Sequence, residues 1–331
     1  MKNLILLSII SILLSSCSKE ITISSEHHPT ALYDEFWNHV NDNYIYFDEK
    51  EVDWNEVYKS YSPTINANTS EEELLQAMEN SLLELRDGHN LLRTPFRQSK
   101  VYNFRAGYEI HFSPELVENK YINGKLSTEK SFKYGNIDDK TIYIQVPKME
   151  YIYSLRKLIR RLVNDETKNL IIDVRNNGGG NSNPVPELLG DFVTEKTLLG
   201  SYIEKSGPRR EDETAPIPIY AIPSAEYHFD IQVFVLINRG GFSATSYWAG
   251  MVDDLPNFTL VGQITGGGGG GNAGFELSNG WALAVSVSDF IDAKGKTIEL
   301  GVSPDIAIEN SESDILNGRD LMLDKVLELR D

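Results

Sequence analysis

Two short and almost wholly apolar segments most strongly constrain how this chain can fold. Residues 169–174 read Asn-Leu-Ile-Ile-Asp-Val, and residues 231–237 read Ile-Gln-Val-Phe-Val-Leu-Ile. Runs of this length are typical of strands in a sheet that is covered on both faces. Helical patterns lie before, between and after them, and strands that alternate with helices predict an α/β core.

The flanking segments extend this pattern. β-branched and aromatic residues predict strands over 101–112 and 141–146, and another strand that begins at Leu260. Apolar residues at helical spacing predict amphipathic helices over 151–163, 243–254 and 313–329.

The N-terminal part has a different hydrophobic pattern. Apolar and aromatic side chains recur at helical spacing over residues 30–86, and Ser70-Glu71-Glu72-Glu73 forms a capping box. We therefore predict a small N-terminal helical domain at residues 30–95, followed by a core domain at residues 96–331.

The first residues are predicted to direct export. A positive start precedes an apolar run over 4–14 that is too short to span a bilayer. Leu14-Ser15-Ser16-Cys17 follows and resembles the lipobox of bacterial lipoproteins, in which the cysteine carries lipid. We expect a signal peptide over 1–17, a lipidated Cys17 and a tether over 18–29. An ordinary signal peptide with an incidental cysteine is the alternative.

Composition excludes several classes of partner. The formal net charge is −18, which argues against nucleic acid because phosphate contacts need clustered Lys and Arg. We expect contact with a membrane through the lipid anchor only. Cys17 is the only cysteine, so the chain forms no internal disulfide. Histidine spacing typical of a metal site is absent, and we expect no metal and no cofactor.

Ser243 stands where the second apolar strand passes through a glycine turn into a helix. A helix N-terminus offers free backbone N–H groups and a positive dipole end, which can stabilise an oxyanion. This arrangement is similar to the nucleophile elbow of hydrolases, although the G-x-S-x-G motif itself is absent. The alternative is that Ser243 only caps the helix.

The first apolar strand runs into Gly178-Gly179-Gly180. Bare backbone amides at a sheet edge can bind an anion or an oxyanion. A phosphate loop is the competing interpretation, but no Lys-Ser or Lys-Thr follows the glycines as the Walker pattern requires. A further candidate is His89, which follows Asp87-Gly88 and is therefore predicted to lie on a turn.

Four segments together resemble the carboxyl-terminal processing family of serine peptidases. They occur in the family's order: the Asp-Gly-His turn at 87–89, the Asp-x-Arg-Asn-Asn-x-Gly-Gly strand end at 173–180, the Ser-Ala pair at 243–244, and residues 298–306. The last segment resembles the family's Glu-x-x-Gly-Val-x-Pro-Asp ending, with one residue fewer before Gly-Val.

The resemblance implies a ClpP/crotonase-like sandwich core behind the helical domain, and a serine peptidase acting on peptides or unfolded exported proteins. Ser243 would be the nucleophile. Its oxyanion hole would be the backbone N–H of Ala244 and of a glycine in the 178–180 run, with Gly179 favoured over Gly178. As a lipoprotein, the chain would lie in the bacterial cell envelope, on the outer membrane.

Two branches of the family differ in the base. One uses a Ser-Lys dyad, but residues 265–271 hold no lysine, and Lys294 and Lys296 come only after the next strand. The other resembles the tricorn core and uses a Ser-His-Glu triad, with His89 and Glu299 at the matching positions. On spacing alone, a solvated side chain is the favoured explanation of Glu299, and only the resemblance assigns it to the triad.

The sequence departs from the family in two further ways. Ser246 stands where many members have glutamate, and the stretch between Arg93 and Thr141 is too short for an inserted PDZ module, so none is expected. These departures keep a rival hypothesis open, namely a non-catalytic lipoprotein that binds peptides or small ligands on the same fold. The natural substrate and the oligomeric state are left open by the sequence.

Overall fold

The computed structural model describes residues 28–330. The predicted signal peptide, Cys17 and all but the last two residues of the predicted tether lie outside the described residues. Within residues 28–330, no helix is both long enough and apolar enough to cross a membrane.

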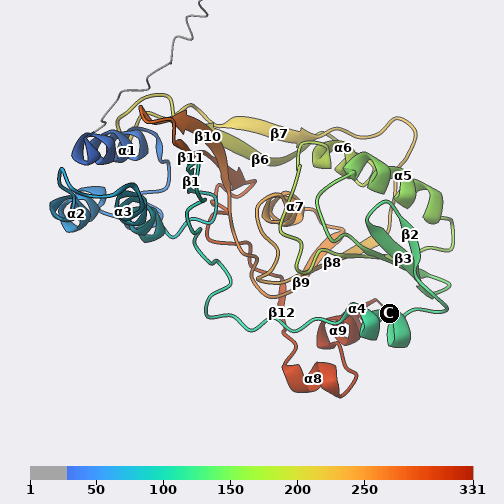
Figure 1. The fold of residues 1–331 in the computed structure, drawn as a ribbon. Helices are drawn as coiled ribbons and strands as arrows, with labels where there is room; N and C mark the ends of the chain where they lie inside the picture. The colour runs from blue at the N-terminus through green and yellow to red at the C-terminus, as the bar shows by residue number, and fades with distance from the viewer. Residues whose placement is uncertain (1–27, 331) are drawn as a thin grey trace, which may run out of the picture.

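A seven-stranded sheet forms one layer of the fold (Figure 1), in the order β12-β9-β8-β5-β4-β3-β2. The two apolar runs of the sequence are its strands β5 and β8, which pair in parallel with Ile172 opposite Val235. Both strands are almost wholly apolar because the sheet is covered on both faces. The strands are β2 (Ser127–Glu129), β3 (Phe132–Asp138), β4 (Thr141–Gln145), β5 (Asn169–Asp173), β8 (Gln232–Ile237), β9 (Phe258–Gly262) and β12 (Ile306–Ala307).

A second, antiparallel sheet forms the opposite layer (Figure 1). Its long strand β11 pairs with β10 along one edge, and with β1 and then β6 along the other, while β7 lies beyond β6. This sheet carries the N-terminal helices on its outer side. Its strands are β1 (Leu91–Arg93), β6 (Thr197–Glu204), β7 (Ile217–Ala221), β10 (Gly270–Glu276) and β11 (Ala282–Asp292).

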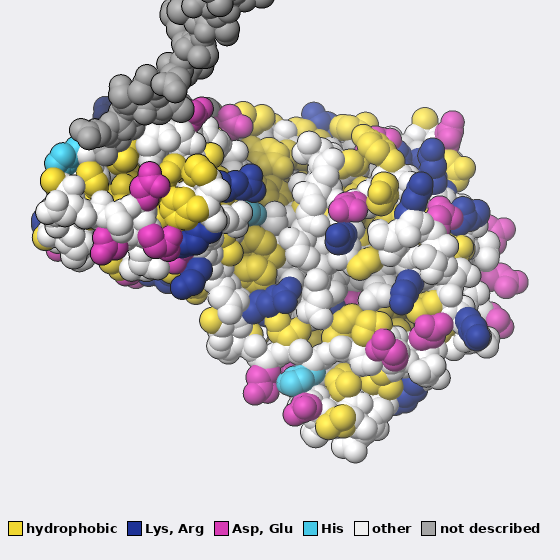
Figure 2. Space-filling view, in the orientation of Figure 1, with side chains coloured by type: hydrophobic (Ala, Val, Ile, Leu, Met, Phe, Trp, Pro, Cys, Tyr) yellow, Lys and Arg dark blue, Asp and Glu magenta, His cyan; other side chains and the backbone are white. Residues whose placement is uncertain are grey.

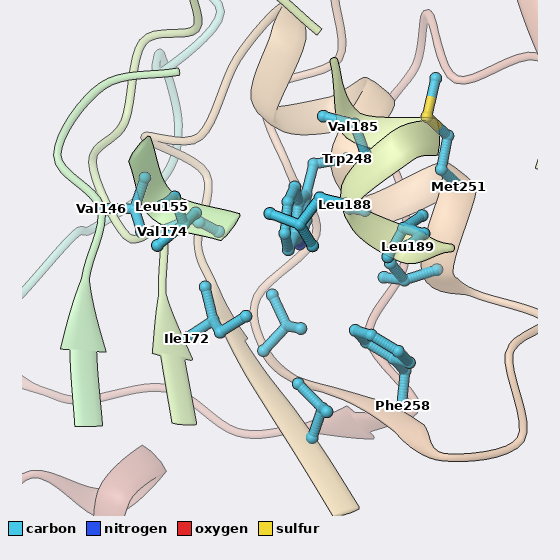
Figure 3. Packing of buried hydrophobic residues seen from close by; sticks show 14 of the residues in the cluster. Val146, Leu155, Ile172, Val174, Val185, Leu188, Leu189, Trp248, Met251 and Phe258 are labelled. Carbon is cyan, nitrogen blue, oxygen red and sulfur yellow. The ribbon is translucent and has the colours of Figure 1, made fainter. Parts of the chain in front are cut away.

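Helix α7 (Ala244–Val252) lies between the two sheets, and every one of its residues is buried. Its side chains pack with α5 (Ile152–Leu162), with α6 (Val185–Leu189) and with both sheets in one hydrophobic core. Figure 3 shows Trp248 of α7 next to Leu188 of α6, with Met251 of α7 and Ile172 of β5 in the same cluster. The fold is therefore a mixed α/β sandwich, as predicted, and its most protected helix begins immediately after Ser243.

Three helices form an N-terminal helical unit, comprising α1 (Pro29–Asn43), α2 (Trp54–Tyr61) and α3 (Glu71–Glu84), with a short helical turn, η1 (Ser62–Thr64). The predicted capping box at Ser70 is present, with Ser70 and Glu73 each satisfying the other's backbone N–H. The helices share a hydrophobic core with Leu283 and Val285 of β11. The unit is thus packed onto the second sheet, and the domain boundary at residue 95 stays a prediction.

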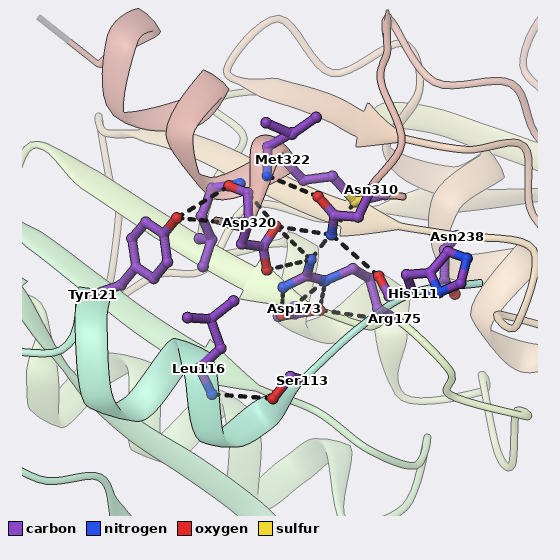
Figure 4. Close-up of polar contacts among 12 residues, drawn as sticks. His111, Ser113, Leu116, Tyr121, Asp173, Arg175, Asn238, Asn310, Asp320 and Met322 are labelled. Atoms are coloured by element: carbon purple, nitrogen blue, oxygen red, sulfur yellow. Dashed lines mark hydrogen bonds and ion pairs between the residues drawn. The ribbon is translucent and has the colours of Figure 1, made fainter. Parts of the chain in front are cut away.

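A buried ionic cluster fixes the C-terminal helix α9 (Leu321–Leu329) to the end of β5 (Figure 4). Arg175 contacts Asp173 at 2.7 Å and Asp320 at 2.8 Å, and all three side chains are fully buried. Asp320 also caps α9 by accepting from the backbone of Leu323. Removing one member of such a cluster leaves an uncompensated buried charge.

Two predicted elements were wrong. Residues 101–112 are irregular rather than a strand, because Asn103 folds the chain into a turn and Gly107 takes a φ of 82°. This irregular stretch leads into α4 (Pro114–Leu116) and η2 (Val117–Tyr121). The single helix predicted over 313–329 is divided at Gly318, whose φ of 71° ends α8 (Glu312–Leu316) before α9 begins.

Candidate active site

Ser243 joins β8 to α7 in a strained backbone conformation. Its φ is 55° and its ψ is −124°, a combination that non-glycine residues adopt at a cost of about 1–3 kcal/mol. The backbone is held there by the hydrogen bond from Ser243 N–H to the Gly267 carbonyl at 2.9 Å. The side chain makes no capping hydrogen bond, so an ordinary N-cap does not explain this residue.

The glycine run after β5 lies directly against Ser243. A Cβ atom on Gly179, whose φ is 105°, would lie 2.8 Å from Ser243 Cβ and 3.1 Å from Ala244 N. The Gly179 N–H is donated to Asn177 Oδ1 at 2.9 Å. Within the described chain, the N–H groups of Gly178 and Ala244 make no hydrogen bond. Free amides are therefore available beside the hydroxyl group.

His89 reaches the same place from the turn that follows α3. Asp87 Oδ1 accepts the His89 backbone N–H at 2.8 Å, and the predicted turn at His89 is confirmed. The imidazole packs on the ring of Phe242, the residue before Ser243, with 4.7 Å between centroids. No hydrogen bond joins His89 to Ser243, and the buried Nδ1 has no partner among residues 28–330.

The electrostatics of His89 favour the neutral imidazole. Burial lowers the pKa of His89 below its ordinary value; Asp87 opposes this shift, while the positive charge of Lys50 reinforces it. A neutral imidazole can accept a proton, which is the property that a general base requires.

The low-complexity tract at 266–271 is a tightly packed strip that links the candidate residues. The Gly267 carbonyl binds Ser243 N–H, and the Gly269 N–H is donated to Glu299 Oε2 at 2.7 Å. A Cβ on Gly268 would meet the Phe242 ring at 2.6 Å and His89 Cε1 at 3.0 Å. Glycine is required because backbone and rings fill the space that side chains would need.

Ser246 supports this strip from α7. Its Oγ donates to the Gly267 carbonyl at 2.8 Å and lies 2.9 Å from Thr265 Oγ1. The residue that departs from the family pattern therefore fixes the same carbonyl that holds the Ser243 backbone.

Glu299 is buried, with 2% of its side chain exposed, and is not a solvated glutamate. Its Oε1 lies 2.7 Å from Lys50 Nζ, while Oε2 accepts from Gly269. Burial raises the pKa of Glu299, as does the charge of Asp87, while Lys50 and the Gly269 N–H oppose the shift. The structure gives no hydrogen bond between Glu299 and His89, although both lie against the Gly268–Gly269 backbone.

Lys50 is the residue of this site that sequence reasoning missed. It comes from the loop between α1 and α2, and its side chain is 7% exposed. By contrast, Lys294 forms ion pairs with Asp253 and Asp254 and is 55% exposed, outside the site. The sequence holds no signal for Lys50, because only the packing of the helical unit against the core buries it.

A cavity of about 140 Å³ opens beside Phe242. Figure 2 shows a hollow between the helical unit and the rest of the molecule, with hydrophobic side chains in its depth and Lys and Arg side chains at its edge. The described residues hold no cluster of His, Cys, Asp or Glu suited to a metal ion. The cavity is lined by Glu49, Lys50, Arg86, Gly88, Tyr102, Phe104, Arg239, Phe242, Gly266, Glu299 and Leu300.

Comparisons with known proteins identify the family of the chain. Residues 140–308 match the model of peptidase family S41, and residues 26–82 match the tricorn protease C1 domain. A carboxyl-terminal-processing protease from Synechocystis is 31% identical over 163 residues, which is 48% of this chain and 36% of that protein. The chain spans about a third of the length of the curated relatives it matches.

Solved structures extend the match to almost the whole chain. A protein from Parabacteroides merdae, provisionally assigned as a peptidase, is 30% identical with a TM-score of 0.84, covering 92% of this chain and 96% of that one. Mature CPAF has the same fold, with a TM-score of 0.68 at 15% identity, covering 90% of this chain and 96% of its own. The family model covers half of the chain, and the Parabacteroides structure covers most of it; the chain therefore belongs to peptidase family S41.

Proposed function

We propose that the chain is a serine peptidase in which Ser243 is the nucleophile and His89 the general base. The observation that carries this proposal is the strained backbone of Ser243, whose side chain makes no capping hydrogen bond and which directly follows Phe242, the ring on which the His89 imidazole packs. Strain of this kind persists where the surrounding structure enforces it, and it is concentrated at functional sites.

The chemistry follows from these groups. Ser243 Oγ attacks the peptide carbonyl carbon while His89 takes the hydroxyl proton. The backbone N–H groups of Ala244 and Gly178 donate hydrogen bonds to the oxyanion. The Gly179 N–H can take the place of the Gly178 N–H if its hydrogen bond to Asn177 breaks. His89 then gives its proton to the leaving amine, the C–N bond breaks, and water hydrolyses the acyl-enzyme by the same route.

Glu299 is the carboxylate of the proposed triad. It lies against the same glycine strip as His89, although its oxygens contact Lys50 and Gly269. A carboxylate near the imidazole stabilises the imidazolium that forms when Ser243 is deprotonated. We propose that Glu299 acts in this way, either through a small rearrangement on substrate binding or through a water molecule.

We further propose that the protein is lipid-anchored through Cys17 in the bacterial cell envelope, on the outer membrane, and cleaves peptides or unfolded segments of exported proteins. The apolar run and lipobox at the start of the sequence support the anchor. Membrane fractionation of cells expressing wild type or Cys17→Ala tests it. The wild type is expected in the membrane fraction and the variant in the soluble fraction.

The test of the peptidase is mass spectrometry of a mixed peptide pool incubated with purified wild type or Ser243→Ala. Wild type is expected to yield new cleavage products, and the variant is expected to lose turnover on the order of 10⁶-fold. A Ser243→Ala protein that produced the same products at the same rate would end the assignment.

One observation favours a second candidate, a non-catalytic lipoprotein that binds a peptide or small ligand. The imidazole Nδ1 is unpartnered and Glu299 is held by Lys50, so the three residues do not form a connected triad. This candidate predicts that wild type leaves every peptide of the pool intact while retaining some of them on a column of immobilised protein.

A further inference from the structure

Lys50 is tied into the site by three contacts. Its ammonium group lies 2.7 Å from Glu299 Oε1 and donates to the Arg86 carbonyl at 3.0 Å. Its own carbonyl accepts from the Arg86 guanidinium. The lysine therefore connects the loop after α1 with the turn that carries Asp87 and His89, and with Glu299, which accepts a hydrogen bond from the glycine strip.

The charges around Glu299 show what this lysine does. Apart from Lys50 and the Gly269 N–H, the groups that act on the carboxylate are mostly acidic or phenolic. A buried carboxyl group among such neighbours takes up a proton unless a cation compensates it. The titratable and charged groups around Glu299 are Lys50, Tyr44 and Tyr46 from the loop after α1, Asp87 and His89 from the turn after α3, Tyr247 from α7 and Asp289 from β11. Glu49, Arg86 and Arg239 line the wall of the adjoining cavity.

We propose that Lys50 is a positioning residue that favours the ionised form of Glu299 and holds it against the glycine strip that His89 also contacts, so that the helical unit completes the active site. The inference rests on the proposed function of Ser243, His89 and Glu299. Lys50 touches neither substrate nor reacting atoms in this scheme. It acts through the carboxylate that it holds.

The proposal predicts a change in pH dependence. The active form needs both Glu299 and His89 deprotonated. The acid limb of kcat/KM therefore reports the pKa at which this coupled pair loses its last proton. Removing the Lys50 charge raises the pKa of that last step, whichever residue holds the proton. An opposite charge at this distance shifts a carboxyl pKa by about 1–3 units, so the acid limb of Lys50→Met is expected to move to higher pH by that amount.

Two variants separate charge from structure. Lys50→Arg keeps the charge and is expected to retain the wild-type acid limb within about half a pH unit, with a lower kcat from imperfect fit. Arg97→Met is the matched control, because Arg97 pairs at 2.7 Å with Glu79, a buried glutamate in α3 that lies outside the proposed triad. It is expected to lower the melting temperature and leave the pH profile unchanged.

The experiment measures kcat/KM between pH 5 and 10 for wild type, Lys50→Met, Lys50→Arg, Arg97→Met and Ser243→Ala, using a fluorogenic peptide built on a cleavage site found in the peptide pool. An acid limb of Lys50→Met that lies at least about one pH unit above that of wild type supports the proposal. An unchanged acid limb, or a loss by the same factor at every pH, overturns it. If Lys50→Met does not fold, a shift of the Lys50→Arg acid limb by a full pH unit also overturns the proposal.

The same data distinguish this inference from the proposed function. Turnover by Ser243→Ala at the wild-type rate contradicts the peptidase mechanism itself. An inactive Ser243→Ala protein together with an unshifted Lys50→Met profile contradicts only the role of Lys50.

Discussion

Asp289 is a buried carboxyl group with no cationic partner in residues 28–330, and its replacement by asparagine is expected to stabilise the protein at alkaline pH. Its Oδ1 accepts from Tyr46 at 2.8 Å and from Thr297 at 2.9 Å, and 6% of the residue is exposed. Burial is the main reason that the pKa of Asp289 is raised from 3.8 to about 7.

The sign of the effect follows from this shift. Because the folded-state pKa lies above the unfolded-state value, the protonated group favours folding, and that contribution is lost as the pH rises from about 4 through 7. The full loss corresponds to about 4 kcal/mol. The asparagine side chain would carry no charge at any pH, but its amide hydrogens would lack an acceptor among the described residues, which costs about 1 kcal/mol.

The net expectation for Asp289→Asn is little change or slight destabilisation at pH 4.5, and a gain that grows by about 3 kcal/mol between pH 4.5 and 8. Urea unfolding followed by tryptophan fluorescence at both values measures it. Asp165→Asn, at an exposed position, is the control and is expected to show no such pH-dependent gain. A stabilisation by Asp289→Asn that is equal at both pH values, or a destabilisation at pH 8, would refute the reasoning.

Two further predictions concern the buried ionic cluster at Asp320 and the packing of Gly268. Asp320→Ala removes the cap of α9 and a partner of buried Arg175, so urea unfolding is expected to show a loss of about 3–5 kcal/mol; a loss below about 1 kcal/mol contradicts the role given to the cluster. Gly268→Ala adds a Cβ that would lie 2.6 Å from the Phe242 ring and 3.0 Å from His89 Cε1, at a φ of 79°. Displacement of the imidazole is expected to lower kcat/KM by about 10²-fold, and a variant with wild-type kinetics would show that His89 is not positioned by this contact.

The parts of the fold that depend on local pattern were predictable from the sequence. The strands β5 and β8 were identified because a doubly covered strand needs apolar residues throughout. The junction at Ser243 followed from a strand, a glycine turn and a helix in succession. The capping box at Ser70 was recognisable because its contacts lie within four residues.

The parts that depend on contacts between distant segments were not predictable. Residues 101–112 have strand-like composition, but no neighbouring strand pairs with them, so turn residues decide their path. The packing of the glycine tract at 266–271 was not predictable, because its partners Phe242, His89 and Glu299 come from elsewhere in the chain. Lys50 is hidden for the same reason, because burial of a lysine depends on a partner far away in sequence.

The most direct measurement of the central claim is covalent labelling with a serine-reactive fluorophosphonate, followed by peptide mapping of the intact protein. Only a serine whose hydroxyl group is activated by a base and served by an oxyanion hole reacts rapidly with such a reagent. The mechanism predicts one label per chain, located on Ser243, lost in Ser243→Ala and strongly slowed in His89→Ala. Absence of labelling in folded wild type, or labelling that persists on another serine in Ser243→Ala, would contradict it.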